Sequence, residues 1–154
     1  MAMVRSSIVR GCRSTAPMAT IFSRIIAGQI PGNFIFQGER WVGLLDIRPS
    51  SAGHALLIPR HEAAFLADLP HDSLADMGAH LARLTSTIKR VSGCPALNAL
   101  LNDGPIAGQE VPHVHWHVVP RWPDDGLGYR FAPQTGAGLT ELATRLAADW
   151  SRSA

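Results

Sequence analysis

The chain has 154 residues, of which 46% are hydrophobic and 17% are charged, and its formal net charge is +2. This length allows one domain with a proper core, and the composition is typical of a soluble globular protein rather than a disordered one. No apolar run approaches the ~20 residues that cross a bilayer, and the basic residues are scattered, so we expect no membrane segment and no nucleic-acid partner. The two cysteines, Cys12 and Cys94, do not indicate a disulfide framework, which favours a reducing, cytoplasmic location.

Residues 1–19 differ in composition from the rest of the chain. They contain three arginines and no acidic residue, and the first acid is Glu39. We expect a disordered extension or a misassigned start, because Met18 begins a natural opening for the domain. The composition also resembles a mitochondrial transit peptide, and a mitochondrial location is expected only in that case. The domain itself is expected over residues 20–154.

The first part of the domain predicts one short helix and three short strands. Thr20 is a good helix cap, and Gly28 is a typical stop for the apolar run that follows it. The next apolar runs are short and bounded by turn residues, which is typical of strands. The expected elements are a helix over 22–27 and strands over 34–36, 41–45 and 54–58, of which the first two form a hairpin.

The clearest predicted helix covers residues 70–91. Apolar residues recur there at three- and four-residue steps, and acids at its start and bases at its end match the helix dipole. His80 lies away from the centre of the apolar stripe, so we expect it at the surface. The stripe consists of Leu74, Met77, Leu81, Leu84, Ile88 and Val91.

A further strand is expected over 97–101, followed by a strong turn at Asn102. A final helix is expected over 139–150, with its apolar residues turned inward: Leu139, Leu142, Leu146 and Trp150. Together these elements predict one α+β domain with a mostly antiparallel sheet and helices packed against it.

Three histidines, His113, His115 and His117, alternate with apolar residues. Alternation is the side-chain period of a strand, so we expect the three imidazoles on one face, about 6.6 Å apart along the backbone. The intervening residues are then expected to point into the core; they are Val114, Trp116 and Val118.

Such a row of imidazoles suits two kinds of chemistry. Two of them can bind Zn²⁺ or Fe²⁺, with the third or His54 completing the site. Alternatively, one neutral imidazole attacks an electrophile while its neighbours orient it. The preceding segment holds Gly104, Gly108 and Gln109, which offer N–H donors rather than carboxylates, so a phosphate-like anion is favoured over a metal. A third interpretation, in which these histidines are only hydrogen-bonded at a sheet surface, is disfavoured because three of them share one face.

The run His113-Val114-His115-Trp116-His117-Val118-Val119 resembles the signature of the histidine triad (HIT) family. The resemblance covers about Ile21 to Arg121, and further blocks match in order: 21–31, 46–49, 53–60, 102–104 and 107–111. It implies a HIT-like α+β fold, with a mostly antiparallel sheet, one long helix and short flanking helices. It also implies a homodimer and a nucleotidyl hydrolase or transferase.

The same resemblance implies a role for each histidine. His115 is expected to attack the α-phosphorus of a nucleotide and to form a nucleotidyl-histidine, which water then hydrolyses. His117 is expected to contact the α-phosphate, while His113 and His54 order and polarise the nucleophile.

The substrate-binding residues follow from the resemblance as well. Gln109 is expected to bind phosphate or the leaving group, and Asn102 to lie beside the phosphate. Asp46 is expected to accept hydrogen bonds from the ribose. Ile47 is expected to pack on the base, and Phe22 and Leu45 are expected to form further walls of the base pocket.

Two features depart from common family patterns. Many bacterial members carry N-terminal cysteines and a structural zinc, but Ser23 stands near that place here and Cys12 has no cysteine nearby, so we expect no metal and no cofactor. Glu110 occupies a position that is often a small hydroxyl residue. An acid there is expected to repel a polyphosphate leaving group and to favour an amine or an amino acid.

The leading hypothesis is therefore a hydrolase of nucleoside phosphoramidates or related conjugates. Three alternatives remain: a dinucleoside polyphosphate hydrolase or phosphorylase, a non-catalytic nucleotide-binding protein, and a metalloenzyme. The homodimer is expected to pair through the helix over 70–91 and the strand over 97–101.

Overall fold

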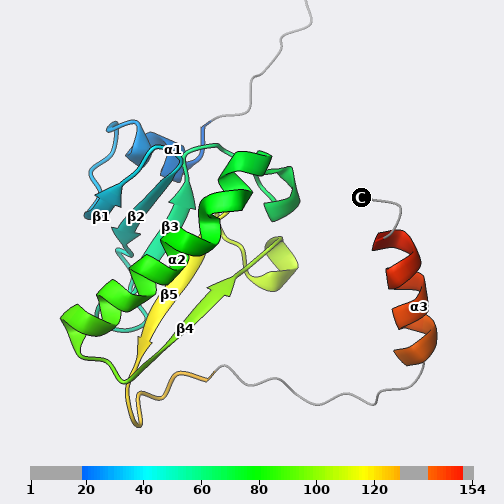
Figure 1. Cartoon of the computed structure of the whole chain (residues 1–154). Coiled ribbons are helices and arrows are strands. Elements are labelled where there is room, and N and C mark those ends of the chain that lie inside the picture. Colours follow the sequence, from blue (N-terminus) through cyan, green and yellow to red (C-terminus); the bar gives the residue numbers. More distant parts are fainter. Residues whose placement is uncertain (1–18, 129–138, 151–154) are drawn as a thin grey trace, which may run out of the picture.

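Five antiparallel strands form the sheet that carries the site (Figure 1). A computed structural model describes residues 19–128 and 139–150. The strands lie in the order β1-β2-β3-β5-β4, so the α+β class and the antiparallel sheet are confirmed. The elements are α1 (Ile21–Ile26), β1 (Phe34–Gln37), β2 (Trp41–Leu45), β3 (Ala55–Pro59), η1 (Leu66–Asp68), α2 (His71–Ser92), β4 (Ala96–Leu101), η2 (Pro105–Ala107), β5 (Trp116–Arg121) and α3 (Leu139–Trp150).

The expected helix at the start of the domain is α1, and the expected hairpin is β1–β2. The side chain of Thr20 accepts a hydrogen bond from the amide of Ser23 at 3.2 Å, which caps α1 as predicted. Gly28 follows the helix with a φ of 74°, the left-handed conformation that glycine adopts without strain. Of the predicted extension over 1–19, all but Ala19 lies outside the described residues.

The long helix α2 crosses one face of the sheet (Figure 1). Leu84 and Ile88 of its predicted stripe are buried in the main core, beside Trp41 and Leu57 of the sheet. Val91, the last member of the stripe, is 79% exposed, so the prediction that it packs with the others is wrong. The helix ends one residue later, so Val91 lies past the edge of the surface that α2 covers.

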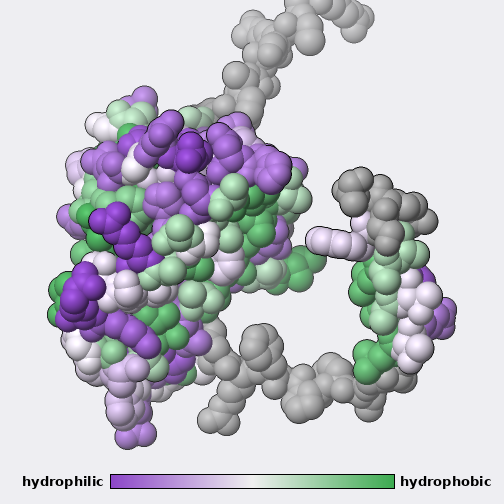
Figure 2. Space-filling model, in the orientation of Figure 1, coloured by the Kyte–Doolittle hydropathy of each residue, from purple (hydrophilic) through white to green (hydrophobic). Residues whose placement is uncertain are grey.

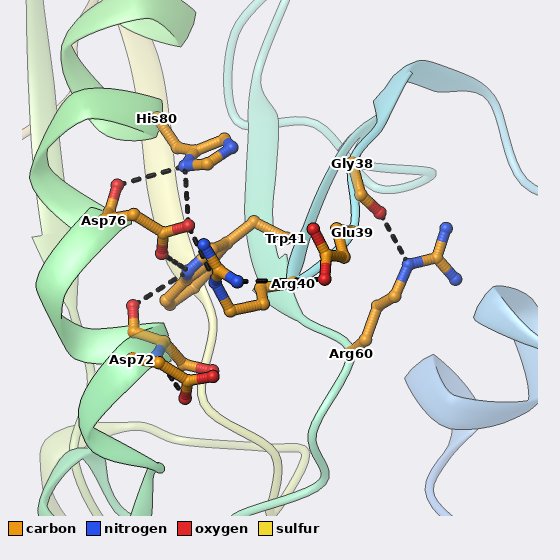
Figure 3. A network of polar contacts seen from close by, with 9 residues as sticks. Gly38, Glu39, Arg40, Trp41, Arg60, Asp72, Asp76 and His80 are labelled. Atoms are coloured by element: carbon orange, nitrogen blue, oxygen red, sulfur yellow. Dashed lines mark hydrogen bonds and ion pairs between the residues drawn. The ribbon is translucent and has the colours of Figure 1, made fainter.

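A polar network ties α2 to β2 (Figure 3). The buried indole of Trp41 donates to Oδ1 of Asp76 at 3.0 Å, and Nε of Arg40 donates to Oδ2 at 2.9 Å. His80 joins this network, because its Nδ1 lies 3.0 Å from the carbonyl oxygen of Asp76 and its ring stacks on Phe36. His80 is therefore half-buried between helix and hairpin, and the expectation of a surface residue is wrong.

The opposite face of the sheet carries α1 and a second core cluster, whose buried members are Phe22, Ile25, Val42, Leu44, Leu56 and Ile58. These strand residues alternate with those of the main core, so the two faces are built from neighbouring positions. The site described below occupies the same face.

The carboxy-terminal helix α3 has the predicted bounds. Its apolar residues do not point into a core, because Leu139, Leu142, Leu146 and Trp150 are 48–81% exposed. The leucines contribute to the hydrophobic strip along the helix in Figure 2. The expectation of an inward face is therefore wrong. Within the described ranges, none of the helices has both the length and the hydropathy of a membrane span.

Candidate functional site

A cavity of about 1090 Å³ lies on the face of the sheet that carries α1. Its floor is a row of residues paired across four strands: Leu44, Leu56, His117 and Leu100. One end is apolar, with Ile21, Phe22 and Ile25 from α1 beside the two leucines. The other end is polar. A pocket with an apolar part and a few convergent polar groups is typical of a small-molecule site.

Leu45 does not line this cavity, and its neighbour Leu44 does. Leu45 pairs with Ala55 on β3, which belongs to the main core under α2. Because side chains alternate along a strand, Leu45 faces away from the cavity. The structure thus replaces Leu45 by Leu44 in the wall, while Phe22 lines the cavity as expected.

Only one histidine of the row lies on a strand, because β5 begins at Trp116. His115 and His117 line the cavity together with His54, but His113 is fully buried and does not. The expectation of three imidazoles on one strand face is therefore wrong. The backbone leaves the ladder before β5, since the amide of Val114 donates to the carbonyl of Ala63 at 2.8 Å. The apolar partners Val114, Trp116 and Val118 do pack in the main core, as predicted.

A backbone carbonyl fixes the protonated nitrogen of His115. Its Nδ1 lies 2.7 Å from the carbonyl oxygen of His113, and a carbonyl can only accept a hydrogen bond. Nδ1 therefore carries the proton in the neutral ring, which leaves the lone pair on Nε2. The ring of Phe22 packs edge-on against this imidazole, with the centroids 4.9 Å apart. The arrangement holds the lone pair on Nε2 of His115 in a fixed orientation.

A backbone amide fixes the protons of the other two cavity histidines. The amide of Ser50 donates to Nδ1 of His54 at 3.1 Å, so Nε2 of His54 carries the proton. That nitrogen lies 3.0 Å from Nδ1 of His117, which must accept. In the neutral ring, Nε2 of His117 is therefore a donor. The contact differs from expectation, because the hydrogen bond of His54 goes to His117 and not to His115, the expected nucleophile.

Burial keeps all four histidines neutral. It lowers the pKa of His54, His113 and His115 below the ordinary 6.5, against the opposing effect of hydrogen bonds or nearby acids. The pKa of His117 falls to about 4, first through burial and then through repulsion from His115 and His54 when those rings are protonated. Near pH 7 each ring therefore has one donor and one acceptor nitrogen, as the hydrogen bonds require.

His113 anchors the segment before β5 to α1 and β3. Its Nε2 lies 2.8 Å from the carbonyl of Pro59, and its Nδ1 lies 2.8 Å from the hydroxyl of Thr20. Thr20 and Ser23 in turn hydrogen-bond to Glu62, and these bonds lower the pKa of the Glu62 carboxyl. Sequence reasoning missed Thr20 and Glu62, because this cluster joins residues up to 93 positions apart.

Asp46 and Ile47 lie at the cavity as expected. Oδ1 of Asp46 accepts from the amide of Arg48 at 2.8 Å, and Oδ2 lies 3.7 Å from Nδ1 of His54. Oδ2 of Asp46 therefore faces the polar end of the cavity, near the histidines. Ile47 is 76% exposed, so its side chain offers a free apolar surface.

Asn102 lines the cavity, where its amide donates to the carbonyl of Gly108 at 3.3 Å. Gln109 does not line it. Its Oε1 accepts from the amide of Gly104 at 3.2 Å, and its Nε2 donates to the carbonyl of Ala64 at 2.8 Å. Both ends of the Gln109 amide are thus engaged inside the protein, and the residue holds the turn around η2 instead of facing a ligand.

Glu110 does line the cavity, and it is paired with Arg48. Nη2 of Arg48 donates to Oε2 of Glu110 at 2.7 Å. A positive charge from the β2–β3 loop therefore balances this acid, and the expected effect of Glu110 on the leaving group stays a prediction. No sequence signal indicated this pair, which spans 62 positions.

Among the described residues, Asp46, His54 and His117 offer ligand atoms that all lie within 4.8 Å of one another. Such a group can in principle hold a metal. Both nitrogens of His54 are already engaged, however, by Ser50 and His117. A metal at this place must first displace those hydrogen bonds, so the donor set fits a hydrogen-bonded chain better, and a metal-free site stays a prediction.

Known proteins resemble this chain in sequence and in fold. The HIT domain model matches residues 27–124. The adenosine 5'-monophosphoramidase hnt1 of Schizosaccharomyces pombe is 38% identical over 130 residues, which cover 80% of this chain and 95% of that protein. The adenylylsulfatase HINT3 of Arabidopsis thaliana is 32% identical over 114 residues, which cover 74% of this chain and 58% of that protein.

A solved structure gives the same result. The crystal structure of the histidine triad nucleotide-binding protein from Candida albicans has a TM-score of 0.76 and 31% sequence identity to this chain. The likeness covers 88% of this chain and all of that one. Because the domain model spans more than half of the chain, and a relative above 30% identity covers most of it, the chain belongs to the HIT family.

Proposed function

We propose that this protein is a nucleotidyl hydrolase that acts on nucleoside phosphoramidates through a histidine nucleophile. The observation that carries the proposal is the 2.7 Å hydrogen bond from Nδ1 of His115 to the carbonyl of His113. It leaves the lone pair on Nε2 of a neutral imidazole at the wall of a nucleotide-sized cavity. Neutral, oriented imidazole is the form that attacks phosphorus.

The reaction then proceeds in two displacements. Nε2 of His115 attacks the α-phosphorus, the phosphorus–nitrogen bond breaks, and the leaving nitrogen takes up a proton from solvent water. A water molecule next attacks the nucleotidyl-histidine and gives its hydroxyl to phosphorus and its remaining proton to solvent. The bond from phosphorus to Nε2 breaks, which restores neutral His115 with its proton on Nδ1. The Nε2–H of His117 is oriented to donate to the phosphoryl oxygens as negative charge builds on them, with the Asn102 turn as a second source of donors.

The cavity provides a place for the rest of the nucleotide. The apolar end, with Phe22 and Leu44, suits a base, and Asp46 suits the ribose hydroxyls because its carboxylate accepts hydrogen bonds. Ile47 is available to cover the base from the solvent side.

The relatives support an activity at the α-phosphate. One is named an adenosine 5'-monophosphoramidase and another an adenylylsulfatase, so both names describe hydrolysis of an adenylyl conjugate. Neither name refers to a dinucleoside polyphosphate, which makes that alternative the weaker one here. A non-catalytic binding protein is also disfavoured, since binding alone does not require the tautomer that the His113 carbonyl imposes on His115.

The decisive experiment compares the wild type with His115→Ala on adenosine 5'-phosphoramidate. We expect the variant to lose turnover. We expect the wild type to carry one nucleotidyl group on His115, which mass spectrometry should detect when the reaction is quenched without acid. His61→Ala, an exposed histidine outside the cavity, is the matched control. Retained activity in His115→Ala would overturn the mechanism. A parallel assay with a dinucleoside tetraphosphate decides between the two substrate classes.

We further propose a homodimer. In the described part of the chain, β4 ends one side of the sheet and has a strand neighbour only in β5. An unprotected edge strand is a ready template for pairing with another copy, and the exposed Val91 lies close by in sequence. A cytoplasmic location stays a prediction that rests on cysteine usage.

A further inference from the structure

Four polar side chains form a cluster that does not line the cavity. It joins the cap and the first turn of α1 to the loop after β3 and to the segment before β5. Its hydrogen bonds connect residues up to 93 positions apart, so it holds three separate parts of the chain together. We call it the Glu62 cluster, and its members are Thr20, Ser23, Glu62 and His113.

Glu62 holds the start of α1 through a single carboxylate oxygen. Its Oε2 accepts from the amide of Thr20 at 3.0 Å and from the hydroxyl of Ser23. The bonds from Ser23 and Thr20 keep the pKa of the Glu62 carboxyl below the ordinary 4.5, so near pH 7 the group is ionised and can only accept. The hydroxyl proton of Ser23 is therefore used by Glu62, which leaves that of Thr20 for another partner.

The Thr20 hydroxyl donates to the ring of His113. Nε2 of His113 lies 2.8 Å from the carbonyl oxygen of Pro59 and must donate to it, so Nδ1 of the neutral ring has the lone pair. The Thr20 hydroxyl lies 2.8 Å from this Nδ1 and supplies the proton between them. Both ring nitrogens of His113 are thereby fixed, one by β3 and the other by the cap of α1.

The peptide group between His113 and Val114 orients His115. Its carbonyl oxygen lies 2.7 Å from Nδ1 of His115, and its N–H donates to the carbonyl of Ala63 at 2.8 Å. Ala63 directly follows Glu62, so one loop holds this peptide group through its backbone and α1 through a side chain. The carbonyl that sets the tautomer of His115 is therefore tied to the Glu62 cluster from both sides.

We infer that Glu62 is a positioning residue for His115. It acts through the Thr20 hydroxyl and the ring of His113, and the inference rests on the proposed function. Without the carboxylate, Thr20 and Ser23 lose their shared acceptor, and the Thr20 hydroxyl is no longer held on Nδ1 of His113. The His113 carbonyl is then free to turn away from His115. A His115 ring with its proton on Nε2 has no lone pair there for phosphorus.

The location of Glu62 separates positioning from folding. The residue is exposed, so its truncation opens no cavity in either core. Water can replace the carboxylate as an acceptor for the Thr20 amide and the Ser23 hydroxyl, but it does not hold the two groups at one point. The loss of Glu62 is therefore expected to affect the reaction more than the stability of the fold.

The first test compares Glu62→Ala with Glu62→Gln on adenosine 5'-phosphoramidate. The alanine variant has no acceptor and should lower kcat about tenfold with little change in KM, which is within the ~100-fold that a misplacement of 1 Å can cost. The glutamine variant keeps one oxygen as the acceptor and should retain most of the wild-type kcat. Glu39→Ala removes an acid that is 89% exposed on the β1–β2 turn and is the matched control.

A second pair of variants tests the route through Thr20. Thr20→Val removes the hydroxyl and should lower kcat as Glu62→Ala does, whereas Thr20→Ser keeps the hydroxyl and should retain most of the activity. Because both residues act on the same imidazole, the double variant of Glu62→Ala and Thr20→Val should be no slower than the slower single variant. Additive losses would overturn the inference.

The ring nitrogens of His115 give a readout that does not depend on turnover. Their NMR chemical shifts distinguish a protonated nitrogen from one with a lone pair. In the wild type the proton is expected on Nδ1 alone, as the bond to the His113 carbonyl requires. In Glu62→Ala and Thr20→Val a part of the protein should carry the proton on Nε2, and Glu62→Gln should restore the wild-type spectrum.

Activity and tautomer together separate the two proposals. If the wild type does not hydrolyse the phosphoramidate, the proposed function is wrong, and the NMR spectra alone decide whether Glu62 positions His115. If the wild type turns over but Glu62→Ala keeps its kcat or its tautomer, the inference is wrong while the function stands. A higher KM with an unchanged kcat would also overturn the inference, because Glu62 would then support only the cavity wall on α1.

Discussion

Nε2 of His54 lies 3.0 Å from Nδ1 of His117, so the histidine that precedes β3 orders the imidazole on β5. The orientation starts further back, because the amide of Ser50 fixes which nitrogen of His54 carries the proton. A turn between β2 and β3 thereby sets the donor at the floor of the cavity. His115 is oriented separately, by the carbonyl of His113.

Because His117 and His115 are oriented by different partners, His54→Ala has a predictable effect. The variant should lower kcat/KM by about 10–100-fold, the loss expected when one oriented donor becomes free to rotate. Because His54 acts through His117, the double variant with His117→Ala should be no slower than His117→Ala alone. Steady-state kinetics on adenosine 5'-phosphoramidate measures both effects. Additive losses in the double variant would show that His54 acts directly on the substrate or on His115.

The depressed histidine pKa values predict the acid limb of the pH–rate profile. Since burial lowers the pKa of His115 and takes that of His117 to about 4, both rings stay neutral at their ordinary value of 6.5. For the free enzyme, kcat/KM should therefore be flat from neutral pH down to about 6.5, and its acid limb should lie below that pH. A limb centred at or above 6.5 would contradict this.

The same groups predict how stability changes with pH. A histidine whose pKa is lower in the folded state stabilises the protein fully above its unfolded pKa and loses that contribution as pH falls toward the folded value. For His117 this window runs from 6.5 down to about 4. The free energy of unfolding, measured in urea, should therefore be smaller at about pH 5 than at about pH 7.5. In His117→Asn the difference should shrink; an unchanged difference would exclude His117 as a contributor.

The choice between Leu44 and Leu45 gives a matched pair of variants. Leu44→Ala removes a buried wall of the cavity, so we expect a several-fold higher KM and a loss of about 2–4 kcal/mol in unfolding free energy. Leu45→Ala, at a residue that is 38% exposed on the other face, should change both far less. Kinetics at a temperature where both variants are folded separates binding from stability. Equal effects on KM would place the base elsewhere.

Most elements of the fold were predictable because their signals are local. Capping at Thr20, the stop at Gly28 and the apolar period of α2 each depend on residues within a few positions. The error at Leu45 has a different origin. Strand alternation assigns side chains to two faces of the sheet but does not say which face holds the site. That face is identified only by the strand register, in which Leu44 pairs with Leu56 and Leu56 pairs with His117.

The details of the site depend on long-range contacts. Alternation predicted a strand at His113. Two contacts hold this segment out of the sheet: the His113 ring contacts the carbonyl of Pro59, and the amide of Val114 donates to the carbonyl of Ala63. The partners of Gln109 and of Glu110 likewise come from distant loops, at Ala64 and Arg48. Residue type indicated polar donors and an acid correctly, but not whether those groups were free.

The proposed homodimer gives the last prediction. Sedimentation velocity at micromolar concentration should show twice the chain mass of 16.6 kDa. Val91→Lys places a charge on the exposed apolar surface at the end of α2, next to β4, and should shift the protein toward the monomer. Ile35→Lys is the matched control, because Ile35 is an exposed apolar residue on β1, at the other edge of the same sheet. A monomeric wild type would contradict the dimer. A dimer disrupted by Ile35→Lys but not by Val91→Lys would instead place the interface on the β1 edge.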